Sequence, residues 1–439
     1  IQSDIESVYL DQNYFKLRNG TYDPAIQSAM VVIDYAKGTC VGLVGGAGEK
    51  TELRGLNRAT QTYRQPGSCM KPFGAYGPAF EKGTLSPGAG IDDTQFSMGN
   101  WTPVNWYHYY KGYVTVREAV MDSMNIPACR ANMSVNDQDF AWNFAYNCGL
   151  TNLVEADKNV TCLALGGVTK GFTTLQVANA YATIANNGYH IEPKLYTKVV
   201  DRKGEIVLDN TAVDPKQVMS DSTAFMLTSC LSSVVDTPGG TAYGDVLIKG
   251  GSIACAGKTG NTDDDKDRWF CGYTPYYTIA CWTGYDQAKP IGRGYPYPST
   301  MLFNTVMNAI CADKAGASFA AAPSSVTRVE LCRDSGKIAT EACMADPRGS
   351  RVLTDYIAVD AIPTDKCGVH EFVNVCERSG KLASATCKNT VKRSCITRAY
   401  VPSRGVFSSD WGYMKPTETC NTCKTTSGNV VIYRNGKVQ

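Results

Sequence analysis

Three short stretches decide the fold class of this chain: Ser68-Cys-Met-Lys71, Ser123-Met-Asn125 and Lys258-Thr-Gly260. In this order they supply a hydroxyl with an amine three residues later, a second hydroxyl with an amide, and a cationic strand. A serine hydroxyl is a poor nucleophile at neutral pH and needs a base within hydrogen-bond reach. Each triplet alone is a weak signal, because each also occurs in surface helices and turns. The three together, in this order, indicate a serine-based catalytic site.

The first motif is predicted to place a nucleophile and its base on one helix, which runs to about Lys82 and is stopped by Gly83. Residues three apart on a helix share a face, so Ser68 and Lys71 are neighbours. If Lys71 is desolvated close to another cation, its pKa falls and the neutral amine can take the Ser68 proton. The backbone N–H of Ser68, in the first turn, lacks a helical partner and can point at a developing oxyanion.

The second motif follows a predicted helix, in a stretch where Pro127 is expected to turn the chain out of helical conformation. A loop at this point can present the Ser123 hydroxyl as a proton shuttle. The Asn125 amide can hold a substrate carbonyl.

The third motif lies at the end of an apolar strand. Gly260 lets a substrate backbone lie against the strand edge, as in recognition by β-augmentation. Lys258 and Thr259 would hold a substrate carboxylate, and the N–H of Asn261 would complete the oxyanion hole.

The elements around these motifs come in a distinctive order. Two β-rich runs at 28–35 and 39–44 form a hairpin signal, and apolar residues at helical spacing then mark several helices, one of them capped by Asp221. Three strands at 253–259, 268–273 and 277–283 precede a last amphipathic helix. Strands at both ends of a helical middle predict an α/β sandwich whose sheet is assembled from both ends of the domain.

Composition limits the remaining possibilities. Hydrophobic residues make up 43% of the chain and charged residues 19%, so a sizeable core is expected. A net charge of +2 gives no electrostatic reason to expect nucleic acid as a partner. No run of about 18 apolar residues is present. Because the chain begins at Ile1 rather than Met, we expect a fragment of a longer protein.

The amino-acid composition changes after about residue 315, where an alanine-rich stretch at 316–328 is typical of a linker. Beyond it lies an internal repeat, predicted as two cysteine-rich modules at 329–372 and 373–439. The segment from Cys332 to Cys343 recurs as the segment from Cys376 to Cys387. Two copies of one small module are the simplest explanation.

The 18 cysteines divide into ten up to Cys311 and eight from Cys332 onwards. Most of the first ten are interpreted as small buried hydrophobes. In the repeat, disulfides such as Cys332–Cys343 and Cys376–Cys387 would suit an oxidising compartment. Two structural zinc sites are the alternative, and the sequence leaves both open. The two candidate ligand sets are Cys332, Cys343, Cys367, His370 and Cys376, Cys387, Cys420, Cys423.

Over roughly residues 1–311 the chain resembles the transpeptidase half of a class A, bifunctional penicillin-binding protein. Besides the three motifs, the resemblance rests on Gln27–Asp34 with Val44-Gly-Gly46, Leu56–Thr60, Arg64–Phe73, Val114–Ala119, Tyr181–Gly188 and Asp267–Pro275. Two positions depart from the family pattern. Cys69 directly follows the nucleophile and is expected to pack rather than react, and Asn261 stands where a threonine is expected.

The resemblance implies a fold like that of serine β-lactamases and penicillin-binding transpeptidases, an antiparallel sheet with helices on both sides, over residues 26–315. Residues 1–25 would be a linker from a missing N-terminal glycosyltransferase domain, and a membrane anchor would precede that domain. The protein would then lie at the extracytoplasmic face of a bacterial plasma membrane.

The resemblance also implies a reaction. Stem peptides ending in D-Ala-D-Ala would acylate Ser68, with Lys71 as the base. Ser123 and Lys258 would also be catalytic, whereas Asn125, Thr259, Gly260 and Asn261 would bind substrate. A second stem peptide would resolve the acyl-enzyme into a crosslink without a catalytic cofactor, and β-lactams would trap Ser68.

Other activities remain open. A D,D-carboxypeptidase or a serine β-lactamase would share the motifs, although no Glu-x-x-Leu-Asn stretch lies between Asn125 and Lys258. A non-catalytic β-lactam receptor or wall-binding protein is a further alternative, which the intact motifs disfavour. A zinc hydrolase is disfavoured because the three histidines form no HExxH pair. His108 and His190 are expected to be structural or exposed.

Overall fold

The computed structural model describes residues 1–292, 297–398, 408–423, 433–434 and 437–438. Its centre is a five-stranded antiparallel sheet in the order β2-β1-β11-β10-β9. The strands are β1 (Ile26–Asp34), β2 (Thr39–Val44), β9 (Ala256–Asn261), β10 (Asp267–Tyr273) and β11 (Thr278–Tyr285). The first two come from the start of the domain and the last three from its end. This confirms the predicted assembly of the sheet.

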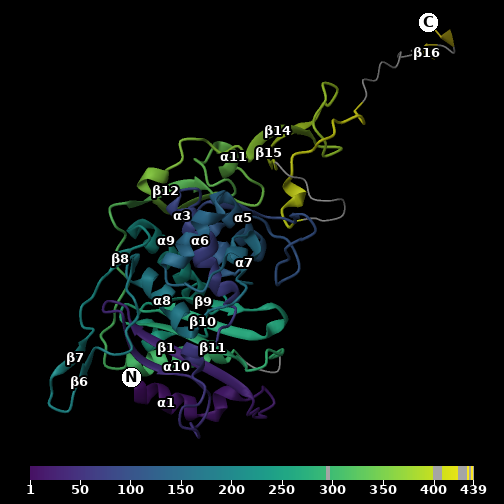
Figure 1. Cartoon of the computed structure of the whole chain (residues 1–439). Coiled ribbons are helices and arrows are strands. Elements are labelled where there is room, and N and C mark those ends of the chain that lie inside the picture. The colour runs from purple at the N-terminus through teal and green to yellow at the C-terminus, as the bar shows by residue number, and fades with distance from the viewer. Residues whose placement is uncertain (293–296, 399–407, 424–432, 435–436, 439) are drawn as a thin grey trace.

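Helices cover both faces of the sheet (Figure 1). On one face lie α1 (Gln2–Leu10) and α10 (Pro298–Ile310), and on the other lies α8 (Thr174–Ala185). The central strands are therefore buried on both sides, which explains why β10 and β11 are buried along their whole length. The predicted antiparallel sheet with helices on both sides is confirmed.

A helical region lies beyond α8 and carries the first two catalytic motifs (Figure 1). Its helices are α3 (Gly77–Glu81), α4 (Val116–Met121), α5 (Asn125–Val135), α6 (Gln138–Asn147), α7 (Val160–Leu165) and α9 (Asp221–Asp236). The short helix α2 (Arg58–Gln61) packs instead against α8, β1 and β2. Short strands join them: β3 (Gly90–Asp93), β4 (Gly112–Thr115), β5 (Tyr189–His190), β6 (Lys198–Val200), β7 (Ile206–Asp209) and β8 (Lys216–Gln217). No helix in the described part of the chain combines the length and apolar character that crossing a bilayer requires.

The expectation that residues 1–25 are a linker was wrong for their first part. Helix α1 packs against α10 and β2, and Ile5 and Tyr9 are almost completely buried. Their spacing of four residues places both on one face of α1. The Tyr9 hydroxyl also forms a 3.0 Å hydrogen bond with Ser28 Oγ in β1. The polar composition of this segment concealed a narrow apolar face.

Three local predictions are also corrected. The helix after Ser68 is not regular: it consists of a 3₁₀ turn (Gly67–Met70), a π-helical turn (Pro72–Tyr76) and α3. Pro127 does not end a helix, because it lies in the first turn of α5, where its missing N–H is not needed. The cap of α9 is Ser220, not Asp221, since Ser220 Oγ accepts a hydrogen bond from the Thr223 N–H at 3.2 Å.

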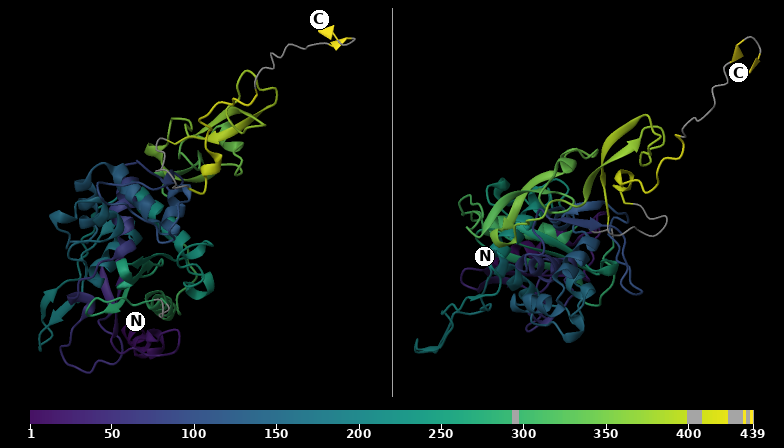
Figure 2. Two further views of the ribbon diagram at one scale, coloured as in Figure 1. Left: turned by 90° about the vertical axis from the view of Figure 1, so that its right-hand side faces the viewer. Right: turned by 90° about the horizontal axis from the view of Figure 1, so that it is seen from above.

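The repeat forms one antiparallel strand pair in each copy, and both pairs lie at the helical end of the molecule (Figure 2). The first pair is β12 (Val326–Cys332) with β13 (Val352–Ala358), with α11 (Glu341–Met344) between them, and the second is β14 (His370–Cys376) with β15 (Thr390–Ile396). Two further short strands, β16 (Tyr433–Arg434) and β17 (Lys437–Val438), pair near the C-terminus. Strand β12 begins inside the predicted linker 316–328.

The first module lies against the helix that leads into the second motif. The Arg117 guanidinium, in α4, forms a two-pronged ion pair with Asp355 in β13, at 2.8 and 2.5 Å. Arg333 of the module pairs with Glu118 of the same helix. The first module is therefore bound to α4, the helix that ends two residues before Ser123.

Candidate active site

Ser68 lies in the 3₁₀ turn at the start of the helical segment, half-buried on the wall of a cleft. The preceding Gly67 has a φ of 52°, a conformation that favours glycine. A Cβ at Gly67 would lie 2.2 Å from the Asn261 carbonyl oxygen. The nucleophile turn and the end of β9 are therefore in direct backbone contact, which only glycine permits.

Lys71 is completely buried one turn after Ser68. Its Nζ donates to the Ser123 carbonyl oxygen at 2.6 Å, the Asn125 Oδ1 at 2.8 Å and the Met124 carbonyl oxygen at 3.1 Å, and lies 3.4 Å from Ser123 Oγ. The first two motifs are thus joined through one amine. Among the described residues, Ser68 Oγ forms no hydrogen bond, so Lys71 is not yet engaged with its proposed partner; such contacts often tighten only with substrate bound.

Both buried lysines have pKa values below the usual range of a lysine. Burial lowers the pKa of Lys71 well below its usual range, and the nearby positive charge of Lys258 lowers it further. Burial also lowers the pKa of Lys258 to about 8. The predicted arrangement, in which a desolvated Lys71 lies near a second cation, is therefore present.

The second motif is held in a strained conformation. Ser123 is buried and has a φ of 53°, which is uncommon for a residue with a side chain. Asn125 is fixed from both ends: its Nδ2 donates to the Val104 carbonyl oxygen at 2.9 Å, and its backbone N–H donates to Asn105 Oδ1 at 3.0 Å. Asn105 in turn donates to buried Asp93 at 2.6 Å.

The third motif occupies an edge strand, because β9 pairs with β10 on one side only. A Cβ at Gly260 would lie 2.6 Å from the Pro66 carbonyl oxygen and 2.8 Å from Cys69 Sγ. Cys69 is buried, and its thiol donates to the Lys258 carbonyl oxygen at 3.4 Å, so it packs rather than faces the cleft. Thr259 Oγ1 is hydrogen-bonded to Thr241 at 2.8 Å.

Lys258 is a buried cation with no acidic partner in the described part of the chain. Its side chain is completely buried, and its hydrogen bond within the described residues goes to the adjacent Thr259 carbonyl oxygen at 3.2 Å. It forms no ion pair within the same part of the chain, although the free energy of a buried charge favours pairing. An anionic group of a ligand would supply the missing partner.

The cleft has a volume of about 1040 Å³ and is lined by all three motifs, through residues that include Ser68, Ser123, Asn125, Thr259 and Asn261. The opposite wall comes from residues 101–108, among them exposed Trp106 and His108. The sequence interpretation missed this segment, although its dense aromatic residues between two motifs were a usable signal. His108 is exposed as expected, and His190 is partly buried against Thr183 at 3.2 Å.

All eighteen cysteines lie in described parts of the chain and carry free thiols, so neither of the two expected disulfides is formed. Eight of the ten cysteines up to Cys311 are buried, which agrees with their interpretation as small hydrophobes. In the repeat the structure brings together both predicted ligand sets: Cys332, Cys343, Cys367, His370 and Cys376, Cys387, Cys420, Cys423.

Comparisons with known proteins agree with this geometry. Residues 28–297 match the model of the penicillin binding protein transpeptidase domain, and residues 322–372 match that of the penicillin-binding protein 1A C-terminal domain. Penicillin-binding protein 1A of Clostridium botulinum is 30% identical over 96% of this chain, and that of Clostridium perfringens is 31% identical over 85%. The chain covers 52% and 46% of these relatives, so it spans about half of their length.

A solved structure gives the same answer at the level of the fold. Penicillin-binding protein 1A from Haemophilus influenzae is 25% identical with a TM-score of 0.66, over 80% of this chain and 56% of that one. The matched family model covers the sheet and all three motifs. The chain therefore belongs to the family of the penicillin-binding protein transpeptidase domain.

Proposed function

We propose that this chain is a serine D-alanyl-D-alanine transpeptidase that crosslinks peptidoglycan stem peptides through an acyl-enzyme on Ser68. The observation that carries the proposal is the pair of buried lysines. Lys71 is buried with a lowered pKa one turn from Ser68, and Lys258 is a buried cation that forms no ion pair with any residue that the structure describes. The first suits a general base, and the second suits recognition of a terminal carboxylate.

In the acylation step the donor peptide lies along the free edge of β9, with its terminal carboxylate toward Lys258 and Thr259. Ser68 Oγ attacks the carbonyl carbon of the penultimate D-alanine, and its proton passes to neutral Lys71. The backbone N–H groups of Ser68 and Asn261 are the proposed donors to the oxyanion. The peptide C–N bond then breaks, and the leaving D-alanine nitrogen receives the proton through Ser123 Oγ.

The second step reverses the proton path. The amine of a second stem peptide attacks the acyl carbon, loses a proton toward Lys71, and displaces Ser68 Oγ, which regains a proton. An amide crosslink forms and the ester bond breaks. Asn125 is proposed to hold the donor amide during both steps. A β-lactam resembles the donor, but its leaving amine stays attached, so the acyl-enzyme persists.

Two related activities use the same site. A D,D-carboxypeptidase would resolve the acyl-enzyme with water instead of an amine. A β-lactamase would need a base for that water. The described cleft lining contains three aspartates, Asp263, Asp264 and Asp265, and no glutamate; Asp265 is already paired with Arg268 at 2.5 Å. This supports slow hydrolysis and favours transfer to an amine.

The relatives are about twice as long as this chain. We propose that a glycosyltransferase domain and a membrane anchor precede the chain in the complete protein, and that the site faces the bacterial cell envelope outside the plasma membrane.

A peptide assay tests the proposal. The protein is incubated with a stem pentapeptide ending in D-Ala-D-Ala, with and without a stem-peptide amine acceptor, and the products are separated by mass. We expect release of D-alanine and an acceptor-dependent crosslinked product, both lost in Ser68→Ala. D-alanine release without any crosslinked product would indicate a carboxypeptidase, and no release by the native protein would refute an enzymatic role.

A further inference from the structure

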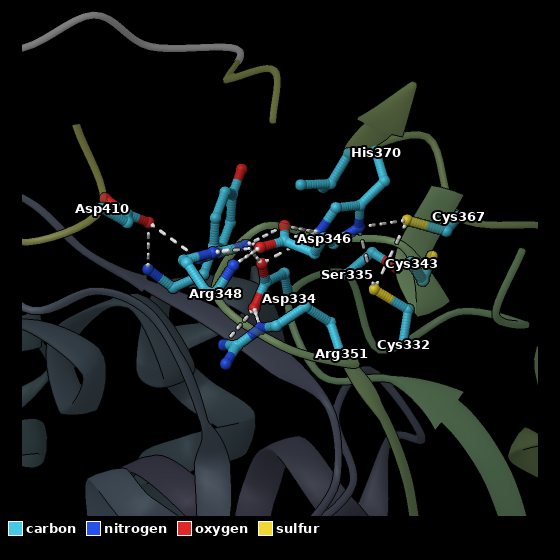
Figure 3. Close-up of polar contacts among 12 residues, drawn as sticks. Cys332, Asp334, Ser335, Cys343, Asp346, Arg348, Arg351, Cys367, His370 and Asp410 are labelled. Atoms are coloured by element: carbon cyan, nitrogen blue, oxygen red, sulfur yellow. Dashed lines mark hydrogen bonds and ion pairs between the residues drawn. The ribbon is translucent and has the colours of Figure 1, made fainter. Parts of the chain in front are cut away.

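The two cysteine-rich modules carry clusters of metal-ligating atoms that the proposed reaction does not use. The first joins Cys332 at the end of β12, Cys343 in α11, Cys367 in the loop before β14 and His370 at the start of β14 (Figure 3). The second joins four cysteines of the following repeat. In each cluster, one ligand atom per residue lies within 4.8 Å of all the others. We propose that each module binds one structural Zn²⁺ ion.

The distances in the first cluster fit a tetrahedral ion. Zinc bound at about 2.3 Å by thiolates at tetrahedral angles requires sulfur atoms about 3.8 Å apart, and a sulfur–nitrogen pair slightly closer. The sulfur atoms of Cys332 and Cys367 are 3.5 Å apart, and each lies 3.4 Å from His370 Nδ1. A disulfide would join two of the three sulfurs and leave the third facing a buried imidazole.

The histidine is oriented as a metal ligand. His370 Nδ1 faces the sulfurs, whereas its Nε2 lies 3.0 Å from Asp346 and 3.2 Å from Asp334 (Figure 3). A ligating imidazole commonly donates its other N–H to a carboxylate, which fixes the ring and the tautomer. Both carboxylates are held by arginines: Arg348 donates to Asp346 at 2.8 Å, and Arg351 to Asp334 at 3.0 Å.

The second cluster repeats the arrangement. Cys376 and Cys423 have sulfur atoms 3.6 Å apart. The Ser384 backbone N–H donates to Cys387 Sγ at 3.3 Å, as Thr340 does to Cys343 Sγ at 3.3 Å in the first module. Such N–H···S bonds favour the thiolate that binds metal.

The backbone near the ligands is equivalent as well. The Cys367 N–H donates to the Ile338 carbonyl oxygen at 2.8 Å, and the Cys420 N–H donates to that of Leu382 at 2.7 Å. Both ligand sets end with two ligands separated by two residues, a common zinc spacing.

The chemistry favours zinc among the metals. Tetrahedral sets of sulfur, or of sulfur with one imidazole, suit zinc or iron–sulfur chemistry rather than magnesium or calcium. All four positions in each set are filled by protein ligands, so the ion has no open position and is structural. Each module is small, and such domains commonly depend on a metal for folding.

The test uses the whole chain, purified without added metal or chelator. Metal content is measured by elemental mass spectrometry, and free thiols are counted after denaturation without reductant. We expect two zinc ions per chain and all eighteen thiols. Absence of zinc with fewer than eighteen thiols would overturn the proposal in favour of disulfides. Stoichiometric iron in place of zinc would overturn the choice of metal.

Matched variants locate the ions. Cys367→Ser and Cys420→Ser should each lower the zinc content from two ions to one. Cys395→Ala is the control, because Cys395 is a buried cysteine of the same repeat that belongs to neither cluster. It should retain two ions. Unchanged zinc in both ligand variants would overturn the assignment.

If the ligand variants do not fold, cobalt substitution of the native chain decides. Tetrahedral thiolate cobalt gives intense charge-transfer and visible absorption bands, which two equivalents of zinc should remove. A spectrum typical of octahedral oxygen ligands would contradict the proposed ligand sets.

Discussion

The ion pair between Asp355 and Arg117 links the first C-terminal module to the catalytic site. Asp355→Ala removes two charge-assisted hydrogen bonds, of 2.8 and 2.5 Å, from a guanidinium whose side chain is 23% exposed. Hydrogen bonds of charged groups contribute about 1.5–3 kcal/mol when buried. Arg117 keeps hydrogen bonds to Ser229 O at 2.8 Å and Ser233 Oγ at 3.2 Å, so its charge remains solvated. The expected loss of unfolding free energy is therefore smaller, about 1–2 kcal/mol.

The functional effect follows from the position of Arg117. It lies in α4, which ends two residues before Ser123, and the Ser123 carbonyl oxygen accepts a hydrogen bond from Lys71 at 2.6 Å. A displacement of the order of 1 Å can slow a positioned reaction by up to about 100-fold. We expect Asp355→Ala to slow acylation by benzylpenicillin by about 3- to 10-fold, and to lower the melting temperature by about 2 °C.

The assay measures the acylation rate by stopped-flow or quenched mass spectrometry, together with thermal melting. Glu330→Ala is the control, because Glu330 is an exposed carboxylate on neighbouring β12 without an ion pair in the described residues. The double variant with Arg117→Ala gives the coupling energy of the pair. If Asp355→Ala melts and reacts like Glu330→Ala, the module does not brace the site.

Three further predictions concern the site itself. The acylation rate should rise with pH as Lys71 loses its proton. It should fall above about pH 8, because Lys258 becomes neutral and no longer attracts the carboxylate. An acylation rate that keeps rising through pH 10 would exclude this role of Lys258. Asn125→Asp places a carboxylate 2.8 Å from the Lys71 amine, which should raise the pKa of Lys71. The acid limb of the pH profile should therefore move to higher pH, and acylation at pH 7 should slow about 10-fold. An acid limb at the native pH would contradict Lys71 as the base. Gly260→Ala puts a methyl group 2.6 Å from the Pro66 carbonyl oxygen. The acylation rate should therefore fall about 10-fold or more, and the melting temperature should fall as well. Native-like kinetics and melting would show that the turn can move.

The sequence was sufficient to predict the sheet and the three motifs because both depend on strong local signals. Strands β10 and β11 are buried on both faces and read as apolar runs, and the motifs are short and ordered. Helix α1 was missed because only Ile5 and Tyr9 mark its buried face within a polar segment. Pro127 was misread because proline is equally suited to the first turn of a helix.

Long-range contacts were the main feature that the sequence concealed. Nothing local indicates that Arg117 meets Asp355, since these residues are far apart in the chain. The same holds for Asn105, which connects the aromatic wall of the cleft to the backbone of Asn125. The proposal of metal ligands rather than disulfides rests on convergence in space, because the count of cysteines alone fits either.

The most direct test of the central claim is the intact mass of the chain after incubation with benzylpenicillin, followed over hours, with Ser68→Ala as the control. We expect one adduct per chain that persists and is absent from the variant. A persistent adduct that remains in Ser68→Ala would contradict the assignment of the nucleophile. Rapid loss of the adduct with release of hydrolysed drug would indicate a β-lactamase, and no adduct on the native chain would contradict the proposed acyl-enzyme.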